Sequence, residues 1–343
     1  MSLPYYRLTS IYFLKIIQLS LILPNRSPYQ LKSGILPPGG SGGIGIDKYI
    51  HSAILNMHNF AGNVKNPENY WIVYAQGGTQ LINALIYALA TINGKTTPVF
   101  AQTPFYNQYQ NFAEYNSNTY WNASYYQTDV ADEIIEFVTA PNNPTGEMRT
   151  AYYSTSKYLV YDMVYYWPTW TNISFQADYD TMIFSLSKLT GHAGSRFGWA
   201  LVKDPQVASE MRSFINLINI HTSLDTVHRA ATILNAMVSS DGEFFDVISN
   251  TMAERYARIL PLFENQSTFT IDSVTSPPTW FYMWIKCEQS SDCVQVFADA
   301  NMKVEDGQLF GSTSQYIRIQ LTMRSADFEI FYKRLESLLH SAL

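Results

Sequence analysis

The sequence predicts an α/β protein with a mostly parallel sheet covered by helices, followed by a smaller C-terminal α+β domain. The chain has 343 residues, of which 47% are hydrophobic, so it is long enough for about two domains with a sizeable core. From about residue 46, short apolar runs bounded by turn residues alternate with helical patterns, and this alternation changes near residue 240. We therefore expect a large domain at 46–240 and a small domain at 241–343, with residues 1–45 fitting neither.

Both domains are expected to combine short strands with amphipathic helices. The strands of the large domain are continuous apolar runs, which is typical of parallel strands buried on both faces. We expect them at residues 71–75, 98–101, 134–139, 157–161, 181–185 and 198–202, with helices at 50–60, 81–90 and 205–236. A further long helix is expected at 243–262, beyond the domain boundary. In the small domain we expect strands at residues 280–286, 302–305 and 316–321, and helices at 291–300 and 325–341.

Composition and charge exclude several classes of partner. The net charge is -6 and the isoelectric point is near 5.5, so the chain lacks the basic field that holds a nucleic acid. The apolar run 11–23 contains Lys15 and Gln18 and is too short and too polar to span a bilayer. It also lacks the small-residue cleavage site of a signal peptide, although a signal sequence stays open as an alternative. We therefore expect a cytoplasmic protein that binds neither nucleic acid nor membrane.

Cys287 and Cys293 are too few to form a disulfide framework, and no Cys/His cluster has the spacing of zinc ligands. We expect two reduced thiols and no metal site. The four Asn-x-Ser sequons are expected by chance in a chain rich in Asn and Ser; they begin at Asn25, Asn122, Asn172 and Asn265.

Two glycine-rich segments differ in their context. Residues 40–45 match G-x-G-x-x-G, but Pro37 and Pro38 precede them where a dinucleotide-binding motif requires a strand, so we interpret this segment as a flexible loop. Gly77, Gly78 and Thr79 instead lie between an apolar strand and a helix. Backbone N–H groups at such a helix start suit a phosphate, although an ordinary strand-to-helix turn has the same pattern.

Lys188 lies just beyond an apolar strand, among small and hydroxyl-bearing residues. Ser185 and Ser187 precede it and Arg196 follows eight residues later, so the segment combines an amine with groups that bind anions. Such a lysine can form a Schiff base with a carbonyl compound. The alternative is a lysine that remains cationic and pairs with a carboxylate.

The segment 187–201, SKLTGHAGSRFGWAL, resembles the cofactor-lysine region of fold-type I pyridoxal 5'-phosphate (PLP) enzymes, in particular the alliinase and tryptophan aminotransferase-related family. Three further segments resemble motifs of that family in the same order: GGTQL at 77–81, APNNPTG at 140–146 and YDMVYYWP at 161–168. The resemblance covers about residues 47–340 and implies the fold-type I architecture, a homodimer and PLP as cofactor. Residues 1–45 do not match the family's N-terminal segment, which closes over the substrate.

The resemblance assigns three catalytic residues. Lys188 would bind PLP covalently and then move the substrate proton. Asp162 would keep the pyridine nitrogen protonated, which strengthens the ring as an electron sink, although an aspartate at a strand end also commonly caps a helix. Tyr165 and Asn143 would hydrogen-bond the 3-oxygen of the cofactor.

Further residues would surround the rest of the cofactor and the substrate. The phosphate would be bound by Gly77, Gly78, Thr79, Ser185, Ser187 and Arg196. Tyr106 would stack on the pyridine ring, with core packing as the alternative. Arg318, in an apolar strand, needs a partner, and with Asn143 it would bind the α-carboxylate of the substrate. No chemistry is expected of the histidines, His58 and His192 included.

The resemblance leaves three functions to distinguish. We expect an aminotransferase that moves the amino group of an L-amino acid, aromatic like L-tryptophan, to a 2-oxo acid. The first alternative is the alliinase reaction, a C–S lyase reaction by β-elimination of cysteine sulfoxides. Alliinases carry a cysteine-rich N-terminal module that two cysteines cannot provide, which favours the transferase. The second alternative is a non-catalytic homologue.

Overall fold

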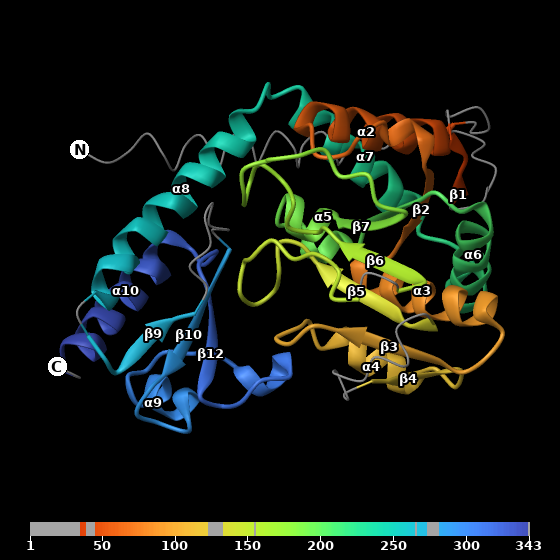
Figure 1. Ribbon diagram of the computed structural model, residues 1–343. Coiled ribbons are helices and arrows are strands. Elements are labelled where there is room, and N and C mark those ends of the chain that lie inside the picture. Colours follow the sequence, from red (N-terminus) through yellow and green to blue (C-terminus); the bar gives the residue numbers. More distant parts are fainter. Residues whose placement is uncertain are drawn as a thin grey trace.

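The computed structural model describes residues 35–38, 45–122, 133–153, 156–264, 266–272 and 281–341. These residues form an eight-stranded sheet of order β1-β2-β8-β7-β6-β5-β3-β4 and a four-stranded sheet of order β11-β12-β10-β9, which lie side by side in Figure 1. The apolar run 11–23, the glycine-rich residues 40–44 and the sequons at Asn25 and Asn265 lie outside the described residues, as does most of the 1–45 segment. The domain boundary expected near residue 240 stays a prediction.

The large sheet is mostly parallel, as the sequence predicts. Its strands are β1 (Ile35–Leu36), β2 (Trp71–Ala75), β3 (Thr97–Ala101), β4 (Thr119–Trp121), β5 (Ile135–Thr139), β6 (Tyr158–Asp162), β7 (Thr181–Ser185) and β8 (Gly198–Val202). We expected β8 to be parallel, and this was wrong, because it runs antiparallel to both β7 and β2. The segment between β7 and β8 contains only the four-residue helix α5 (Leu186–Leu189) and a 3₁₀ turn. A parallel connection needs a longer crossover, usually a full helix.

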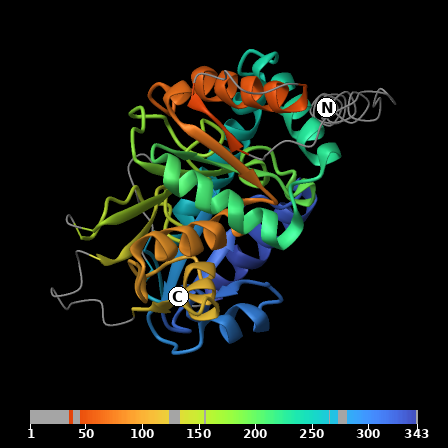
Figure 2. The same ribbon diagram turned by 90° about the vertical axis from the view of Figure 1, so that its right-hand side faces the viewer.

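Helices cover both faces of this sheet. Adjacent side chains of β7 point to opposite faces. Ile183 approaches Gly78 at the start of α3 (Gly78–Asn93), whereas the ring of Phe184 lies 4.5 Å from that of His58 in α2 (Ile46–Ala61). The helix α6 (Pro205–Asn219) packs with α3, and α7 (Leu224–Val238) packs with α2 (Figures 1 and 2). The single helical stretch expected at 205–236 is therefore two helices, separated at Ile220, whose φ of 63° ends α6.

The small sheet is antiparallel and belongs to the C-terminal part of the chain. It contains β9 (Phe269–Ile271), β10 (Tyr282–Cys287), β11 (Glu305–Asp306) and β12 (Tyr316–Gln320). Its helices are α8 (Glu243–Ile259), α9 (Cys293–Asp299) and α10 (Ser325–Ser341), and Figure 1 shows α8 reaching from beside α2 to α10. Across the described residues no helix is both long and apolar enough to cross a bilayer.

The two cysteines are joined, so the expectation of reduced thiols was wrong. Cys287 at the end of β10 and Cys293 at the start of α9 form a disulfide, with 5.6 Å between their Cα atoms. The chain between them folds back, because Cys287 N–H donates to the Gln315 carbonyl (2.9 Å) and Cys293 N–H donates to the Ser314 carbonyl (2.8 Å). Both cysteines therefore approach the same partner segment. The cytoplasmic location stays a prediction.

Candidate active site

The expected catalytic groups gather at one edge of the large sheet. Strands β5, β6 and β7 are parallel neighbours, and they end at Thr139, Asp162 and Ser185. In an open α/β sheet, ligands bind outside the carboxyl ends of the strands. The small domain meets the loops at this edge, since Phe105 N–H, in the loop after β3, donates to the carbonyl of Phe310 (3.0 Å).

Asp162 is buried at the end of β6. Its Oδ2 accepts a hydrogen bond from the Tyr109 hydroxyl (2.7 Å) and its Oδ1 accepts one from Val164 N–H (3.3 Å). Burial raises the pKa of Asp162 to about 6, while both hydrogen bonds and the charge of Lys188 lower it. Asp162 is therefore a carboxylate at neutral pH, enclosed where a cationic partner would stabilise it. A protonated pyridine nitrogen is such a partner.

Lys188 lies in α5, directly after β7. Its Nζ is 5.4 Å from the ring centroid of Tyr165 in the large domain and 5.3 Å from that of Phe281 in the small domain. Its carbonyl accepts a hydrogen bond from Trp170 Nε1 (2.7 Å), which holds the backbone of α5. In the described ranges no carboxylate forms a salt bridge with Lys188. The alternative of a carboxylate-paired lysine thus has no support there.

The turn between β2 and α3 has the geometry of an anion site. Gly77 adopts a positive φ of 84°, and a Cβ there would lie 3.0 Å from Nη2 of Arg196. Gly198 on β8 is also required, because its Cβ would lie 2.9 Å from the backbone of Gly77 and Gly78. Arg196 Nη2 donates to the carbonyl of Gln76 (3.3 Å), which places the guanidinium over the turn. A helix N-terminus below an arginine is a suitable phosphate site.

The other expected phosphate residues lie next to this turn. The Cβ of Ser185 is 3.9 Å from the position that a Cβ on Gly78 would occupy. Ser185 caps α5, because its Oγ accepts a hydrogen bond from Ser187 N–H (3.3 Å). Thr79 is hydrogen-bonded to the hydroxyl of Tyr106, and burial raises the pKa of that hydroxyl. The structure thus brings the phosphate turn and Tyr106 together; stacking of Tyr106 on the cofactor stays a prediction.

Arg318 and Asn143 meet across the two domains. Nη1 of Arg318, on β12, donates to Oδ1 of Asn143 (2.7 Å). The guanidinium carbon is 4.1 Å from the ring centroid of Tyr282 and 4.8 Å from that of Phe310. The buried Nε of Arg318 has no hydrogen-bond partner among the described residues. The guanidinium is thus oriented by its neighbours and retains a donor for a carboxylate.

Tyr165 lies between Lys188, whose Nζ approaches its ring, and Tyr282, whose ring lies beside Arg318. Its hydroxyl is 2.8 Å from the hydroxyl of Tyr282, and burial raises the pKa of Tyr165 well above its ordinary value. Tyr165 therefore keeps its proton and can donate it to an oxygen anion. Such an anion is what the 3-oxygen of PLP presents.

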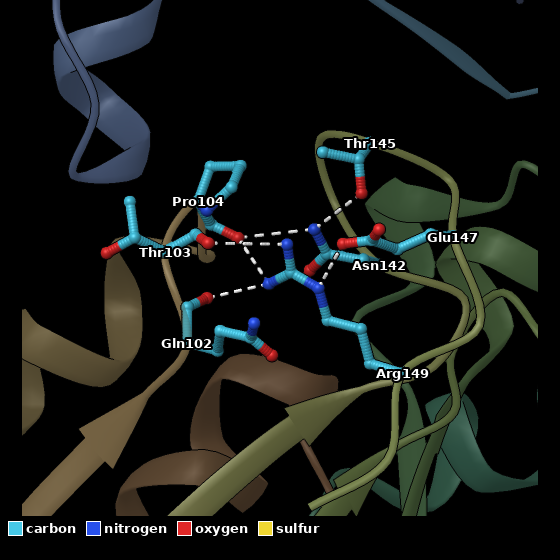
Figure 3. A network of polar contacts seen from close by, with 7 residues as sticks. All are labelled: Gln102, Thr103, Pro104, Asn142, Thr145, Glu147 and Arg149. Carbon is cyan, nitrogen blue, oxygen red and sulfur yellow. Dashed lines mark hydrogen bonds and ion pairs between the residues drawn. The ribbon is translucent and has the colours of Figure 1, made fainter. Parts of the chain in front are cut away.

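Arg149 fixes two loops beside the site, as Figure 3 shows. Its Nη1 donates to the carbonyls of Gln102 (2.6 Å) and Pro104 (2.8 Å), and its Nε is bonded to Glu147. Asn142 Nδ2 donates to the same Pro104 carbonyl (3.2 Å). The loop that leads to Tyr106 is therefore attached to the loop that carries Asn143.

Sequence reasoning missed Tyr109, Tyr282 and Arg149. Each acts through a partner that is far away in the chain, 53 residues for Tyr109 and Asp162, 117 for Tyr282 and Tyr165, and 45 for Arg149 and Pro104. No local motif surrounds these residues, so the sequence alone offered no signal for them. No cluster of metal-binding side chains occurs within the described part of the chain.

Comparisons with known proteins agree with this geometry. The family model described as Allinase matches residues 43–339. Tryptophan aminotransferase-related protein 3 of Arabidopsis thaliana is 32% identical over 312 residues, which cover 84% of this chain and 68% of that protein. An alliin lyase of Allium cepa var. aggregatum is 33% identical over 311 residues, which cover 82% of this chain and 69% of the lyase.

Solved structures show the same fold. An aminotransferase from Staphylococcus aureus superposes with a TM-score of 0.65 at 17% identity, covering 95% of this chain and 99% of the other. A PLP-bound structure from Clostridium difficile 630 superposes with a TM-score of 0.70 at 13% identity, covering 96% and 88%.

The fold and the donor set define a fold-type I, PLP-dependent enzyme. A buried carboxylate, a lysine beyond a strand, a protonated phenol and a phosphate turn beneath an arginine are the groups that PLP requires. The chain belongs to the alliinase family, and its cofactor is PLP.

Proposed function

We propose that this chain is an aminotransferase that moves the amino group of an L-amino acid to a 2-oxo acid. The observation that carries the proposal is the arrangement around the Tyr165–Tyr282 pair. Lys188 approaches the ring of Tyr165, and Arg318, bonded to Asn143, lies over the ring of Tyr282. Amino acid and 2-oxo acid both carry an α-carboxylate, so one guanidinium serves both half-reactions.

The chain's own residues divide the work. PLP, when bound, supplies an electron sink that makes the Cα proton of an amino acid acidic. Asp162 is ionised at neutral pH and supports positive charge on the ring nitrogen. The Nζ of Lys188 accepts the proton that leaves the substrate Cα. Arg318 and Asn143 hold the carboxylate, so that the Cα–H bond has a fixed orientation.

The proposed substrate is an aromatic amino acid such as L-tryptophan. The rings of Phe281, Tyr282 and Phe310 lie around Lys188 and Arg318, and aromatic side chains pair favourably with one another. The Arabidopsis relative is named as related to tryptophan aminotransferase, which also favours an aromatic substrate. The pyruvate-forming C–S lyase reaction on a cysteine sulfoxide is the main rival, because the alliin lyase relative is equally similar. A non-catalytic homologue is the second rival.

One half-reaction separates these functions. With L-tryptophan and no 2-oxo acid, the amino group should stay on the enzyme, and the visible absorption band of the lysine-bound cofactor should be replaced by one at shorter wavelength. Addition of pyruvate should restore the visible band. Rapid release of pyruvate from an alkyl-cysteine sulfoxide with the visible band intact, and no response to tryptophan, would establish the lyase. No response to any amino acid would favour the non-catalytic homologue.

We also propose that the enzyme works as a homodimer. The end of α6 exposes three apolar side chains, Leu217, Ile218 and Ile220, at 80%, 55% and 73%. An exposed apolar patch of this kind is typical of a protein–protein contact. The neighbouring Asn219 accepts a hydrogen bond from Gln80 (2.7 Å), next to the phosphate turn. A second copy bound there would thus adjoin the site. Light scattering of the wild type should give twice the chain mass, and Leu217→Asp with Ile220→Asp should give monomers.

A further inference from the structure

A buried tyrosine outside the family motifs contacts the carboxylate of Asp162. Tyr109 lies in α4 (Gln108–Tyr115) and is fully buried. Its hydroxyl donates to Oδ2 of Asp162 at 2.7 Å and is also 2.7 Å from Oγ1 of Thr139, at the end of β5. One hydroxyl therefore connects the ends of two neighbouring strands at the catalytic edge.

These hydrogen bonds have a defined direction. Burial and the charge of Asp162 raise the pKa of Tyr109 well above its ordinary value, so the phenol keeps its single proton. That proton goes to the carboxylate, which as an anion can only accept. The Thr139 hydroxyl must then donate to the Tyr109 oxygen. The result is a directed chain from Thr139 through Tyr109 to Asp162.

This chain sets the orientation of the carboxylate. Tyr109 holds Oδ2, and Val164 N–H holds Oδ1, so both oxygens are fixed and the carboxylate cannot rotate freely. A carboxylate accepts about four hydrogen bonds. Acceptor capacity on Asp162 therefore remains for a further N–H group.

The ring of Tyr109 supports a second expected cofactor residue. It stacks on Phe137 of β5 with 4.5 Å between centroids and an interplanar angle of 13°. It also meets the ring of Tyr106 edge-on, at 5.7 Å and 88°. Tyr109 is thus packed rigidly on the sheet and forms the wall against which Tyr106 rests.

We propose that Tyr109 is the positioning residue of this active site: it aims the Asp162 carboxylate, stabilises its negative charge and supports the ring of Tyr106. The inference rests on the proposed role of Asp162 toward the pyridine nitrogen. Tyr109 itself acts only through Asp162 and Tyr106.

Loss of the hydroxyl has a predictable effect on proton binding. The groups that act on Asp162 are Tyr109 from α4, Val164 N–H from the following loop and Lys188 from α5, and each lowers its pKa against burial. Tyr106 and Tyr165 also adjoin it, and both remain neutral at ordinary pH. Without the Tyr109 hydroxyl, the pKa of Asp162 rises further above 6, toward the working pH. Asp162 then loses its charge in a larger fraction of molecules.

The test compares Tyr109→Phe with a matched control. Tyr70 is also buried and donates to an aspartate, Asp178 (2.9 Å), outside the site, so Tyr70→Phe removes the same type of hydrogen bond. For Tyr109→Phe we expect kcat to fall about twofold at pH 7 and about fivefold at pH 6, with a smaller change in KM, because the pKa of Asp162 rises by about one unit. The acid limb of the kcat profile should move up by about one pH unit or more, so that activity partly recovers at pH 8.5. Tyr70→Phe should keep the wild-type profile.

A second readout does not depend on turnover. The affinity for PLP, measured by fluorescence quenching of the apoprotein between pH 6 and pH 8.5, should weaken in Tyr109→Phe most strongly at pH 6. Thr139→Val, which removes only the far end of the chain, should show the same trend with a smaller shift. Coincident pH profiles of wild type, Tyr109→Phe and Thr139→Val in PLP affinity would refute the inference. Failure of the proposed reaction would appear separately, as PLP binding without turnover in the wild type.

Discussion

Asp162 and His58 are both fully buried ionisable groups of the large domain, yet their surroundings differ. Burial raises the pKa of Asp162 to about 6 and lowers that of His58 to about 4, so both shifts disfavour the charged form. The carboxylate lies at the carboxyl end of β6, close enough to Lys188 for its charge to lower the pKa of Asp162. The imidazole lies beneath β7 and β8, in a cluster of aromatic rings.

All the hydrogen-bonding capacity of His58 is used within the protein. Its Nε2 accepts from Trp199 Nε1 (2.9 Å), so its Nδ1 carries the proton and donates to Asn63 Oδ1 (2.8 Å). Asn63 in turn donates to the carbonyl of Tyr166 (2.8 Å), and the imidazole stacks on Trp167 at 5.1 Å. His58 thus supports the loop that carries Tyr165 from behind, with no atom left for a ligand.

A shifted pKa alone therefore does not identify a functional group. Asp162 and His58 share burial and a displaced proton equilibrium, but both imidazole nitrogens are occupied, whereas the Asp162 oxygens accept one hydrogen bond each and can accept more. The same distinction separates two arginines. The guanidinium of Arg149 donates hydrogen bonds to backbone carbonyls and to Glu147. The buried Nε of Arg318, in contrast, has no hydrogen-bond partner among the described residues.

The largest effect is expected for Lys188. Lys188→Ala removes the amine that binds the cofactor and moves the proton, so turnover should fall about 1,000-fold or more. Borohydride reduction followed by mass spectrometry should find the cofactor on the 188 peptide of the wild type and not of the variant. The control is Lys203→Ala, since the Lys203 amine is already paired with Asp178 and Asp180 (3.0 and 3.2 Å). Loss of turnover in both variants would contradict the assignment of Lys188 as the lysine that binds the cofactor.

Asp162→Asn should lower activity and raise stability. Without the carboxylate, turnover should fall about 100-fold, a loss typical of a removed electrostatic stabiliser. The folded-state pKa of about 6 exceeds the ordinary 3.8, so the stability that this group contributes is present below pH 3.8 and is lost as pH rises through 6. The Asn apoprotein should therefore be more stable than wild type at pH 8, by about 1–3 kcal/mol, and equally stable at pH 3.5. Denaturant unfolding at both pH values measures this, and a less stable variant at pH 8 would contradict it.

Arg318→Lys should weaken substrate binding. A lysine keeps the charge but loses the planar fork, so KM should rise about tenfold for amino acid and 2-oxo acid alike, with PLP still bound. Arg149→Lys is the matched variant at a fully used arginine. It should lower the free energy of unfolding by about 1–3 kcal/mol and change KM much less. If the two variants affected KM equally, unused donors would not identify the substrate arginine.

The smallest effect on activity is expected for His58→Gln. Turnover should stay within about threefold of wild type, while the free energy of unfolding should fall by about 1–3 kcal/mol because Trp199 and Asn63 lose a well-placed partner. The pKa of His58 falls from 6.5 to about 4 on folding, so its contribution to stability is present above pH 6.5 and is lost as pH falls through 4. Unfolding measured in the Asp162→Asn background, which removes the opposite contribution, should show this acid loss with His58 and not with Gln. A large loss of turnover with normal stability would assign His58 a functional role.

The features that depend on neighbours along the chain could be predicted from the sequence. The alternation of apolar runs and helices gave the α/β class, and the glycine turn at Gly77 and the position of Lys188 after a strand gave the anion site and the amine. Each of these is a strand, a turn and the start of a helix in immediate succession. Local geometry follows from such a succession, because turn residues and helix starts act over only a few residues.

Three features became visible only in the folded chain: the direction of β8, the pairing of Cys287 with Cys293, and the long-range contacts of Asp162 and Arg318. Tyr109, the partner of Asp162, comes from helix α4, 53 residues away in the chain, and Asn143, the partner of Arg318, comes from a loop of the large domain, 175 residues away. Composition and spacing do not encode which of many tyrosines or asparagines will lie beside a given charge. That choice is made by the packing of the sheets, since a hydrogen bond requires atoms within about 3 Å of one another.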